Sequence, residues 1–283
     1  MQQLEKSQIK DALVSYVKRY DSQNAAANSL RDISSATISQ VLNNNWEQIS
    51  DPMWRKISKQ IGFKLNAIKV AETSAYRKAF IIFGDSQRNP QGIRAIVCNA
   101  SLGKDTSIRG WCNSQQNSYH IDCHRQMSVR VLLRDMLRSM GKDSSGTVPE
   151  MLDNVVKYLE RDSDPMFIIN EVDKLRDEVL ELFIDLENKL HGKCGLVWMA
   201  TPYLKKRIEL GVARGKRGFA ELYSRVKKMF LDITPTRKEF AHDVALICKG
   251  YGITNSDQVV EFTNKTDDDF RVLTDLINAF KSH

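Results

Sequence analysis

The stretch AIVCNASLGKDTS, which starts at residue 95, contains most of the residue types of a phosphate-binding loop. Apolar residues are followed by polar ones and then by Gly103 and Lys104, whereas the usual pattern is G-x-x-x-x-G-K-[ST]. In such a loop backbone N–H groups surround the phosphates, and the lysine reaches the β and γ phosphates. Cys98 stands in place of the first glycine, and Asp105 stands in place of the hydroxyl, with Thr106 one position later. The stretch indicates either a nucleotide site with altered chemistry or a loop that has lost this function.

A second apolar run, MFIINEVDKL from residue 166, ends in residues suited to the same chemistry. In ATPases with a phosphate-binding loop this place usually reads Asp-Glu, with the Asp in the metal shell and the Glu polarising the attacking water. Here Asn170 replaces the Asp, while Glu171, the candidate catalytic base, is present. The candidate ligands of a magnesium ion are Asp105, Thr106 and Asn170.

The changes at Asp105 and Asn170 invite two interpretations. Both positions would face one magnesium ion, so the loop has gained a carboxylate where the opposite strand has lost one. One hypothesis is an exchange that leaves the number of carboxylates at the metal unchanged. The other is decay, after which the site no longer hydrolyses or binds nucleotide.

Two later stretches supply further candidates for such a site. GLVWMATPYL predicts a buried strand that ends at Thr201, a polar side chain close to the expected γ-phosphate. ELYSRVKKMF carries Arg225 just before another strand, where an arginine can reach a neighbouring subunit's nucleotide as an arginine finger does. The alternative for Arg225 is a surface charge or a DNA contact.

The elements that would position these residues are predicted by an alternation of apolar runs and helical stretches over residues 67–233. Helical periodicity falls on the segments SVRVLLRDMLRSMG, TVPEMLDNVVKYLE and DEVLELFIDLENKL. The strand-like runs are AFIIFG, RAIVCN, SYHIDC, PMFIIN, GLVWMAT and KMFLDI. Nearly continuous apolar strands that alternate with helices predict a parallel sheet covered on both faces. Residues 234–283 are again helical in pattern.

The first segment, residues 1–66, has helical periodicity and contains a candidate helix-turn-helix. Three alanines on a short helix are followed by a four-residue turn and by a second short helix that begins at a serine cap. In this motif the second helix lies in the major groove of DNA. The outward polar side chains that can bond base edges or phosphates are Ser35, Thr37, Gln40 and Asn43. The alternative is a helical packing module that does not bind DNA.

Charge and composition narrow the class of partner. The chain has 42% apolar and 27% charged residues, as ordinary globular proteins do, and a net charge of +7. Residues 205–228 hold nine Lys or Arg and two acidic residues, an excess that equals that of the whole chain. A basic excess in one segment indicates a polyanion such as nucleic acid, or only a solvated basic face.

The expected cellular compartment follows from the targeting and membrane-spanning segments that the sequence lacks. There is no signal peptide and no run of 18 apolar residues, so we expect a cytoplasmic protein. Five cysteines without a C-x-x-C pair predict reduced and mostly buried thiols.

Taken together, these stretches resemble the transposition protein B family of Mu-type transposing phages, the AAA+ target-selection ATPases. The chain is more distantly similar to the ATPases of Tn7-type elements. The resemblance covers nearly the whole length and rests on the order and spacing of SQNAAANSL, SATISQVL, AIVCNASLGKDTS, FIINEVDKL, GLVWMATPYL and LYSRVKKMFLDITP. It implies an α/β P-loop AAA+ core over residues 67–233, an all-α helix-turn-helix domain over 1–66 and a C-terminal helical subdomain over 234–283.

The resemblance also implies a function. It implies ATP and Mg²⁺ as ligands, and binding to double-stranded DNA without sequence specificity. It further implies self-assembly into a helical filament, delivery of the captured DNA to a transposase and stimulation of that transposase, inside a bacterial host cell.

Site residues follow by position from the resemblance. Residues 103–106 fall on the Walker A loop, Asn170 and Glu171 fall on Walker B, Thr201 falls on sensor 1 and Arg225 falls on the finger. Arg271 opens the last helix, where such ATPases often carry a sensor-2 arginine, although the glycine that usually begins this pattern is missing. The loop residues expected at the nucleotide are Cys98, Asn99, Ala100, Ser101, Leu102, Gly103, Lys104, Asp105 and Thr106. The candidates for DNA contact by charge are Arg125, Arg130, Lys205, Lys206, Lys216 and Arg217.

Other functions are compatible with parts of the sequence. His120, Cys123 and His124 lie close together, but SYHIDC predicts a strand whose neighbours point to opposite faces, which disfavours a zinc site. A DNA-binding scaffold on the same fold would hold nucleotide passively or not at all. A replication-initiator or helicase-loading ATPase would share the core.

Overall fold

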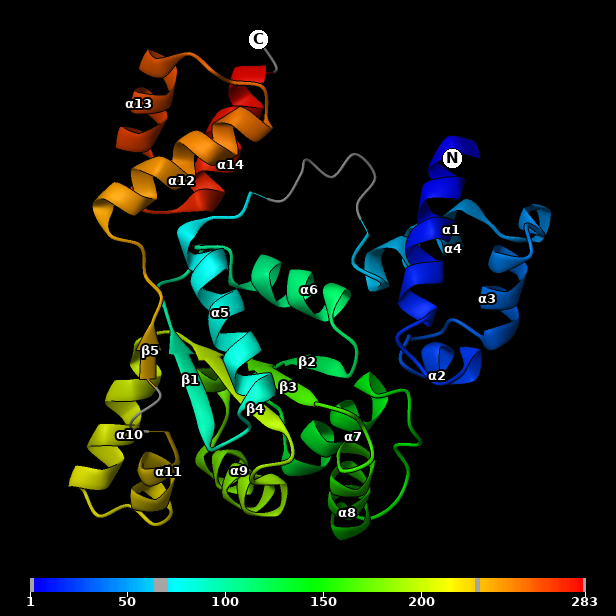
Figure 1. The fold of residues 1–283 in the computed structure, drawn as a ribbon, viewed down its shortest axis with the longest axis vertical. Helices are drawn as coiled ribbons and strands as arrows, with labels where there is room; N and C mark the ends of the chain where they lie inside the picture. Colours follow the sequence, from blue (N-terminus) through cyan, green and yellow to red (C-terminus); the bar gives the residue numbers. More distant parts are fainter. Residues whose placement is uncertain (1–2, 64–70, 227–229, 282–283) are drawn as a thin grey trace.

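The computed structural model describes residues 3–63, 71–226 and 230–281, which form a helical part, an alternating α/β part and a second helical part in chain order (Figure 1). The domain boundary predicted at residue 66 lies outside the described residues. The elements of the first part are α1 (Gln3–Val17), α2 (Gln23–Asn28), α3 (Ser35–Leu42), the 3₁₀ helix η1 (Trp46–Gln48) and α4 (Asp51–Gln60).

The α/β part contains a five-stranded sheet in the order β2-β3-β4-β1-β5, in which every pair is parallel. The predicted fold class, a parallel sheet with helices on both faces, is confirmed. The strands are β1 (Ile93–Val97), β2 (Ser118–Asp122), β3 (Met166–Asn170), β4 (Gly195–Ala200) and β5 (Phe230–Asp232). The helices are α5 (Ser74–Arg88), α6 (Lys104–Ser114), α7 (Val129–Ser139), α8 (Val148–Leu159), η2 (Val172–Lys174), α9 (Asp177–Leu190), α10 (Tyr203–Ala213) and α11 (Phe219–Val226).

One of the six predicted strands is wrong, because AFIIFG lies inside α5. The buried positions of this helix include Ala75, Ala79 and Phe83, which are four residues apart and so share one helical face. Ile81 lies on the other side and is 71% exposed. The spacing of the buried residues, rather than the length of the apolar run, therefore distinguishes helix from strand here.

The two faces of the sheet bury alternate residues of each strand. Phe167 and Ile169 of β3 pack with α7 to α11, whereas Met166 and Ile168 pack with α5, α6 and the C-terminal helices (Figure 1). Trp198 of β4 is fully buried on the first of these faces. Both faces are thus covered, which explains why the strands read as continuous apolar runs in the sequence.

The N-terminal helices have a separate apolar cluster that includes Ile49, Trp54, Ile57 and Ile61, with Trp46 packed against them. Polar contacts join these helices to the α/β part. Arg19 donates to the carbonyl of Cys112 at 2.9 Å, and Lys142 forms an ion pair with Asp21 at 2.8 Å. A Cβ at Gly141, where φ is +69°, would lie 2.2 Å from the carbonyl oxygen of Ala25. Only glycine therefore permits this approach of the two backbones.

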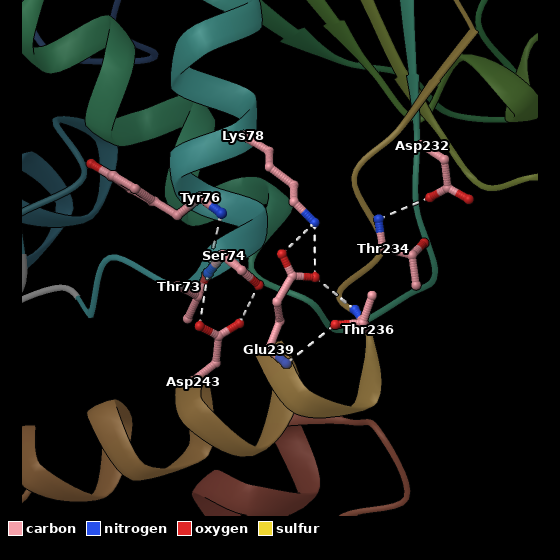
Figure 2. A network of polar contacts seen from close by, with 9 residues as sticks. All are labelled: Thr73, Ser74, Tyr76, Lys78, Asp232, Thr234, Thr236, Glu239 and Asp243. Carbon is pink, nitrogen blue, oxygen red and sulfur yellow. Dashed lines mark hydrogen bonds and ion pairs between the residues drawn. The ribbon is translucent and has the colours of Figure 1, made fainter.

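The C-terminal helices are α12 (Arg237–Gly250), α13 (Ser256–Lys265) and α14 (Phe270–Lys281). Helix α12 is fastened to the start of α5 by polar contacts (Figure 2). Ser74 donates to the carboxyl group of Asp243 through its backbone N–H at 2.8 Å and through its hydroxyl at 2.5 Å. Asp243 is fully buried. One turn earlier on α12, Glu239 forms an ion pair with Lys78 at 2.9 Å.

The contacts of Glu239 with Thr236 and Lys78 are expected to make the stability of the chain sensitive to acid. The backbone N–H of Thr236 and, next, the ammonium group of Lys78 lower the pKa of Glu239 from 4.5 to about 2. Because the folded-state pKa is lowered, its stabilising effect is complete above pH 4.5 and is lost as the pH falls towards about 2. The free energy of unfolding of wild type and of Glu239→Gln, measured by urea titration, should therefore converge over this range. A difference that stays constant with pH would contradict this, and Glu178→Gln is the control.

Candidate functional site

The loop between β1 and α6 has the backbone geometry of a phosphate-binding loop. Gly103 is the N-cap of α6 with φ +83°, and Ser101 also has a positive φ of +63°. Nothing lies within 4 Å of where a Cβ of Gly103 would stand, so the left-handed backbone and not lack of space favours glycine there. Leu102 is buried and anchors the loop in the core. The first N–H groups of α6 therefore point towards the space above the loop, as an anion would require.

Lys104 lies folded across this loop. Its ammonium group donates to the carbonyl of Cys98 at 3.1 Å and to that of Asn99 at 3.3 Å. Cys98, which replaces the usual glycine, is fully buried among apolar side chains of β1 and β4. Burial raises the pKa of the Cys98 thiol to about 11, although Lys104 opposes this shift. Cys98 is thus a neutral packing residue and not a reactive thiol. All five cysteines are free and buried, as the sequence predicted.

The end of β3 brings Asn170 and Asp105 into contact. The Asn170 amide donates through Nδ2 to Asp105 Oδ1 at 3.0 Å and to Asp122 Oδ1 at 2.9 Å. Asn170 is 2% exposed, and its Oδ1 has no hydrogen-bond partner. The two altered positions of the motifs, Asp105 and Asn170, therefore do lie side by side. Sequence reasoning missed Asp122, although it ends the strand paired in register with β3.

Glu171 and Thr201 each have a charged neighbour in this region. Glu171 has a positive φ of +57° and forms an ion pair with Lys174 at 2.6 Å. The Thr201 hydroxyl donates to Asp173 Oδ2 at 3.0 Å. A positive φ at a residue other than glycine, as at Glu171, is a form of backbone strain that is concentrated at functional sites in proteins. Asp173 was also missed, although it stands three residues after Asn170 in the same motif.

One cavity of about 590 Å³ lies at the carboxyl ends of β1, β3 and β4, and neither Asn170 nor Asp122 is among its lining residues. Ala100, Ser101 and Thr106 line it from the loop side, and Thr201 lines it from the end of β4. Its charged lining is balanced between four basic and four acidic side chains: Lys104, Arg109, Lys174, Arg271, Asp105, Glu171, Asp173 and Asp275. Arg271 comes from α14, so the C-terminal helices close one side. A balanced lining does not attract a polyphosphate strongly by itself, which implies a need for a cation.

Arg225 lies outside this cavity lining. It stands in the last turn of α11, which leads to the amino end of β5, whereas the loop follows the carboxyl end of the parallel strand β1. Its guanidinium group forms an ion pair with the buried Glu187 at 3.1 Å and also contacts Asn188. A finger role for Arg225 would require a neighbouring copy of the chain and stays a prediction.

The polar side chains of the candidate recognition helix α3 form hydrogen bonds with nearby residues. The hydroxyl groups of Thr37 and the N-cap Ser34 lie 2.9 Å apart, and Gln40 donates to Gln48 at 2.8 Å. Asn43 is exposed and donates to Ser39, and Ser35 in the first turn is half-buried. Such bonds exchange readily with water or a ligand, so DNA contact by α3 stays a prediction.

The charged DNA candidates do not form one surface. Arg125 and Arg130 are exposed beside β2 at one edge of the sheet. Four others lie on α10 or in the loop to α11, which leads to β5 at the opposite edge (Figure 1): Lys205, Lys206, Lys216 and Arg217. Lys216 is engaged by Asp177 in an ion pair.

A metal site made by the protein alone is not found in the described part of the chain. Over residues 3–63, 71–226 and 230–281 no three His, Cys, Asp or Glu side chains are grouped to hold an ion. The segment with His120, Cys123 and His124 has a buried Cys123 but an exposed His124. None of the described helices is long and apolar enough to cross a membrane.

The comparison with protein-family models agrees with the fold. Residues 87–208 match the family model described as AAA domain. Among solved structures, the chain is similar to the crystal structure of Cdc6p from Pyrobaculum aerophilum, with 15% sequence identity and a TM-score of 0.45. This similarity covers 65% of the chain and 51% of Cdc6p, so the chain spans about half the length of that protein. No curated protein sequence matches the chain. The matched residues include the loop, the end of β3 and the end of β4.

Proposed function

We propose that this chain binds ATP together with magnesium, hydrolyses it slowly, and uses the bound nucleotide to control its binding to double-stranded DNA. The observation that supports the proposal is the gathering of four residues from separate segments around one cavity: Lys104, Glu171, Thr201 and Arg271. Each has the chemistry that a nucleoside triphosphate site requires, and each was selected from the sequence alone.

In the proposed site the phosphates lie against the N–H groups at the start of α6. Lys104 leaves the carbonyl groups of the loop and contacts the β and γ phosphates. Arg271 reaches the phosphates from α14 and so links the C-terminal helices to the occupied site. Magnesium, held beside Asp105, would neutralise charge on the phosphate oxygens.

Glu171 is the proposed general base. It accepts a proton from water as the water oxygen bonds to the γ-phosphorus and the bond from this phosphorus to the bridging oxygen breaks, which yields ADP and phosphate. Its ion pair with Lys174 must open first, because the carboxylate oxygen that lies 2.6 Å from the ammonium group is engaged and does not face the attacking water. Slow turnover is the expected consequence.

The DNA part of the proposal is supported by the net charge of +7 and by the exposed basic residues of the α/β part. Following the resemblance to transposition protein B, we further propose that copies assemble along DNA as a helical filament and deliver it to a transposase. In such a filament Arg225 would exchange Glu187 for the nucleotide of a neighbouring copy.

The testing experiment is DNA binding by the purified chain with ATP and magnesium, with ADP, and without nucleotide. Negative-stain images and phosphate release are taken from the same samples. ATP-dependent binding with filaments and slow phosphate release is the expected result. Equal binding in all three conditions would instead favour a nucleotide-independent DNA scaffold, the second candidate function. The carbonyl contacts of Lys104 and the balanced charge of the cavity are the observations that favour this second candidate.

Removal of one phosphate-contacting arginine should weaken binding to all DNA sequences alike. For Arg130→Ala we expect the slope of log Kd against log salt concentration to decrease by about one unit. Fluorescence anisotropy at several salt concentrations measures this slope. Arg161→Ala, which removes a charge near the amino end of β3, is the control and should keep the wild-type slope. An unchanged slope in Arg130→Ala would exclude this residue from the DNA contact.

A further inference from the structure

The carboxyl end of β2 holds an acidic side chain that neither nucleotide motif includes. Asp122 is paired in register with Asn170, so the two side chains project from neighbouring strand ends. Asn170 Nδ2 donates to Asp122 and to Asp105 at nearly equal distances, 2.9 and 3.0 Å. One amide group therefore joins two carboxylates, that of Asp105 from the loop and that of Asp122 from the end of β2.

The position of the amide suits a cation site. An N–H₂ group that contacts two carboxylates satisfies them as a cation would, and it leaves Asn170 Oδ1 buried without a partner. A buried unpartnered carbonyl costs about 1 to 3 kcal/mol, so such a group calls for an explanation. A magnesium ion beside Asp105 fits this donor set, since magnesium prefers oxygen ligands and is commonly held by one or two carboxylates together with substrate phosphates.

The two carboxylates have different places relative to the nucleotide cavity. Asp105 lines that cavity, whereas Asp122 lines the separate cavities between the α/β part and the N-terminal helices. Asp122 can therefore act on the cation only indirectly, through Asn170. Carboxylates in such outer positions orient the ligands that they contact, and their removal typically weakens metal binding 10- to 100-fold.

We infer that Asp122 is a positioning residue of the cation site: through its hydrogen bond with Asn170 it fixes the amide group that contacts Asp105, and so orients Asp105. This inference rests on the proposed function, because the cation is the one that accompanies ATP. In this chain the hydrogen-bonded residues Asp105, Asn170 and Asp122 would together position the cation. In the usual motifs a hydroxyl group and one aspartate do so.

The experiment is a titration of Mg²⁺ into the full chain with a fixed concentration of N-methylanthraniloyl-labelled ATP, followed by fluorescence. Asp122→Asn is expected to raise the Mg²⁺ concentration at half-maximal nucleotide binding by at least about 10-fold. Binding measured in EDTA should stay as in wild type. Asp135→Asn is the matched control, since it removes the same charge beside one of the cavities that Asp122 lines, and its midpoint should not shift.

A double-mutant cycle separates positioning from simple loss of charge. Asn170→Ala should raise the Mg²⁺ midpoint, and Asp122→Asn added to Asn170→Ala should raise it little further, because the link is already broken. An unshifted midpoint in Asp122→Asn, an equal shift in Asp135→Asn, or fully additive shifts would each overturn the inference. If Asp122→Asn does not fold, two other variants replace it. Asn170→Ala should raise the Mg²⁺ midpoint, and the charge-conserving Asp122→Glu should keep a midpoint near that of wild type. A wild-type chain that binds no nucleotide would overturn the proposed function as well.

Discussion

Lys104→Ala is expected to weaken ATP binding by about 10- to 150-fold, which corresponds to the loss of a charge-assisted contact worth about 1.5 to 3 kcal/mol. The variant removes the ammonium group that the loop holds above its carbonyl groups. Those carbonyls can be satisfied by water, so we expect the fold to be retained. Isothermal titration calorimetry with ATP and magnesium measures the effect, and thermal unfolding verifies the fold.

The matched control for this prediction is Lys174→Ala, which removes the same charge from the same cavity. Lys174 is paired with Glu171, and its removal should weaken ATP binding far less than Lys104→Ala does. Equal losses in the two variants would show that only the net charge of the cavity matters. Wild-type affinity in Lys104→Ala would show that the loop does not hold phosphates. In the presence of ATP and magnesium, Lys104→Ala should no longer bind DNA, whereas a nucleotide-independent DNA scaffold would bind DNA as wild type does.

Asp243→Ala is expected to destabilise the chain by about 3 kcal/mol, the largest effect on stability that we predict. The carboxyl group accepts two hydrogen bonds from Ser74, and the residue is fully buried. Its removal leaves the N–H and hydroxyl groups of Ser74 without an acceptor in a place that water does not reach. Urea unfolding followed by circular dichroism measures the change, and limited proteolysis should reveal release of α12 from α5 (Figure 2).

Asp153→Ala serves as the control for this stability effect. Its carboxylate forms an exposed ion pair with Lys189 at 3.4 Å, and exposed pairs contribute about 1 kcal/mol or less. Ser74→Ala removes one of the two bonds to Asp243 and should lie between the control and Asp243→Ala. If Asp243→Ala is no more destabilising than the control, the contact does not fasten the C-terminal helices.

Sequence patterns were most informative where burial alone decides the structure. Five of the apolar runs became parallel strands, and β1, β3 and β4 are buried throughout because both faces are covered, which leaves a continuous apolar run in the sequence. The run AFIIFG misled because four consecutive apolar residues fit a strand, while the buried set of α5 depends on positions four apart. Local composition therefore identified the five strands but mistook part of α5 for a sixth strand.

The candidate site was predicted in its loop and strand ends but not in its cross-connections. Asp122 and Asp173 were missed because no motif contains an acidic residue at these positions, and only the pairing of strands and the turn after β3 bring them to Asn170 and Thr201. The ion pairs of Lys174 and Arg225 were missed for the same reason. Contacts between side chains depend on register and rotamer, which a single sequence does not display.

The hydrogen bond between Asn170 and Asp105 joins positions that are 65 residues apart in the chain. The hypothesis of an exchange of carboxylates predicts that the two positions change together in evolution, since a change at one alters the charge that the other must balance. Related chains should therefore show correlated substitution, with Ser or Thr at position 105 where position 170 is Asp, and Asp at position 105 where position 170 is Asn. A family profile that scores each motif alone would classify a chain with Asp at 105 and Asn at 170 as degenerate, although its carboxylate count equals that of a chain with Ser or Thr at 105 and Asp at 170.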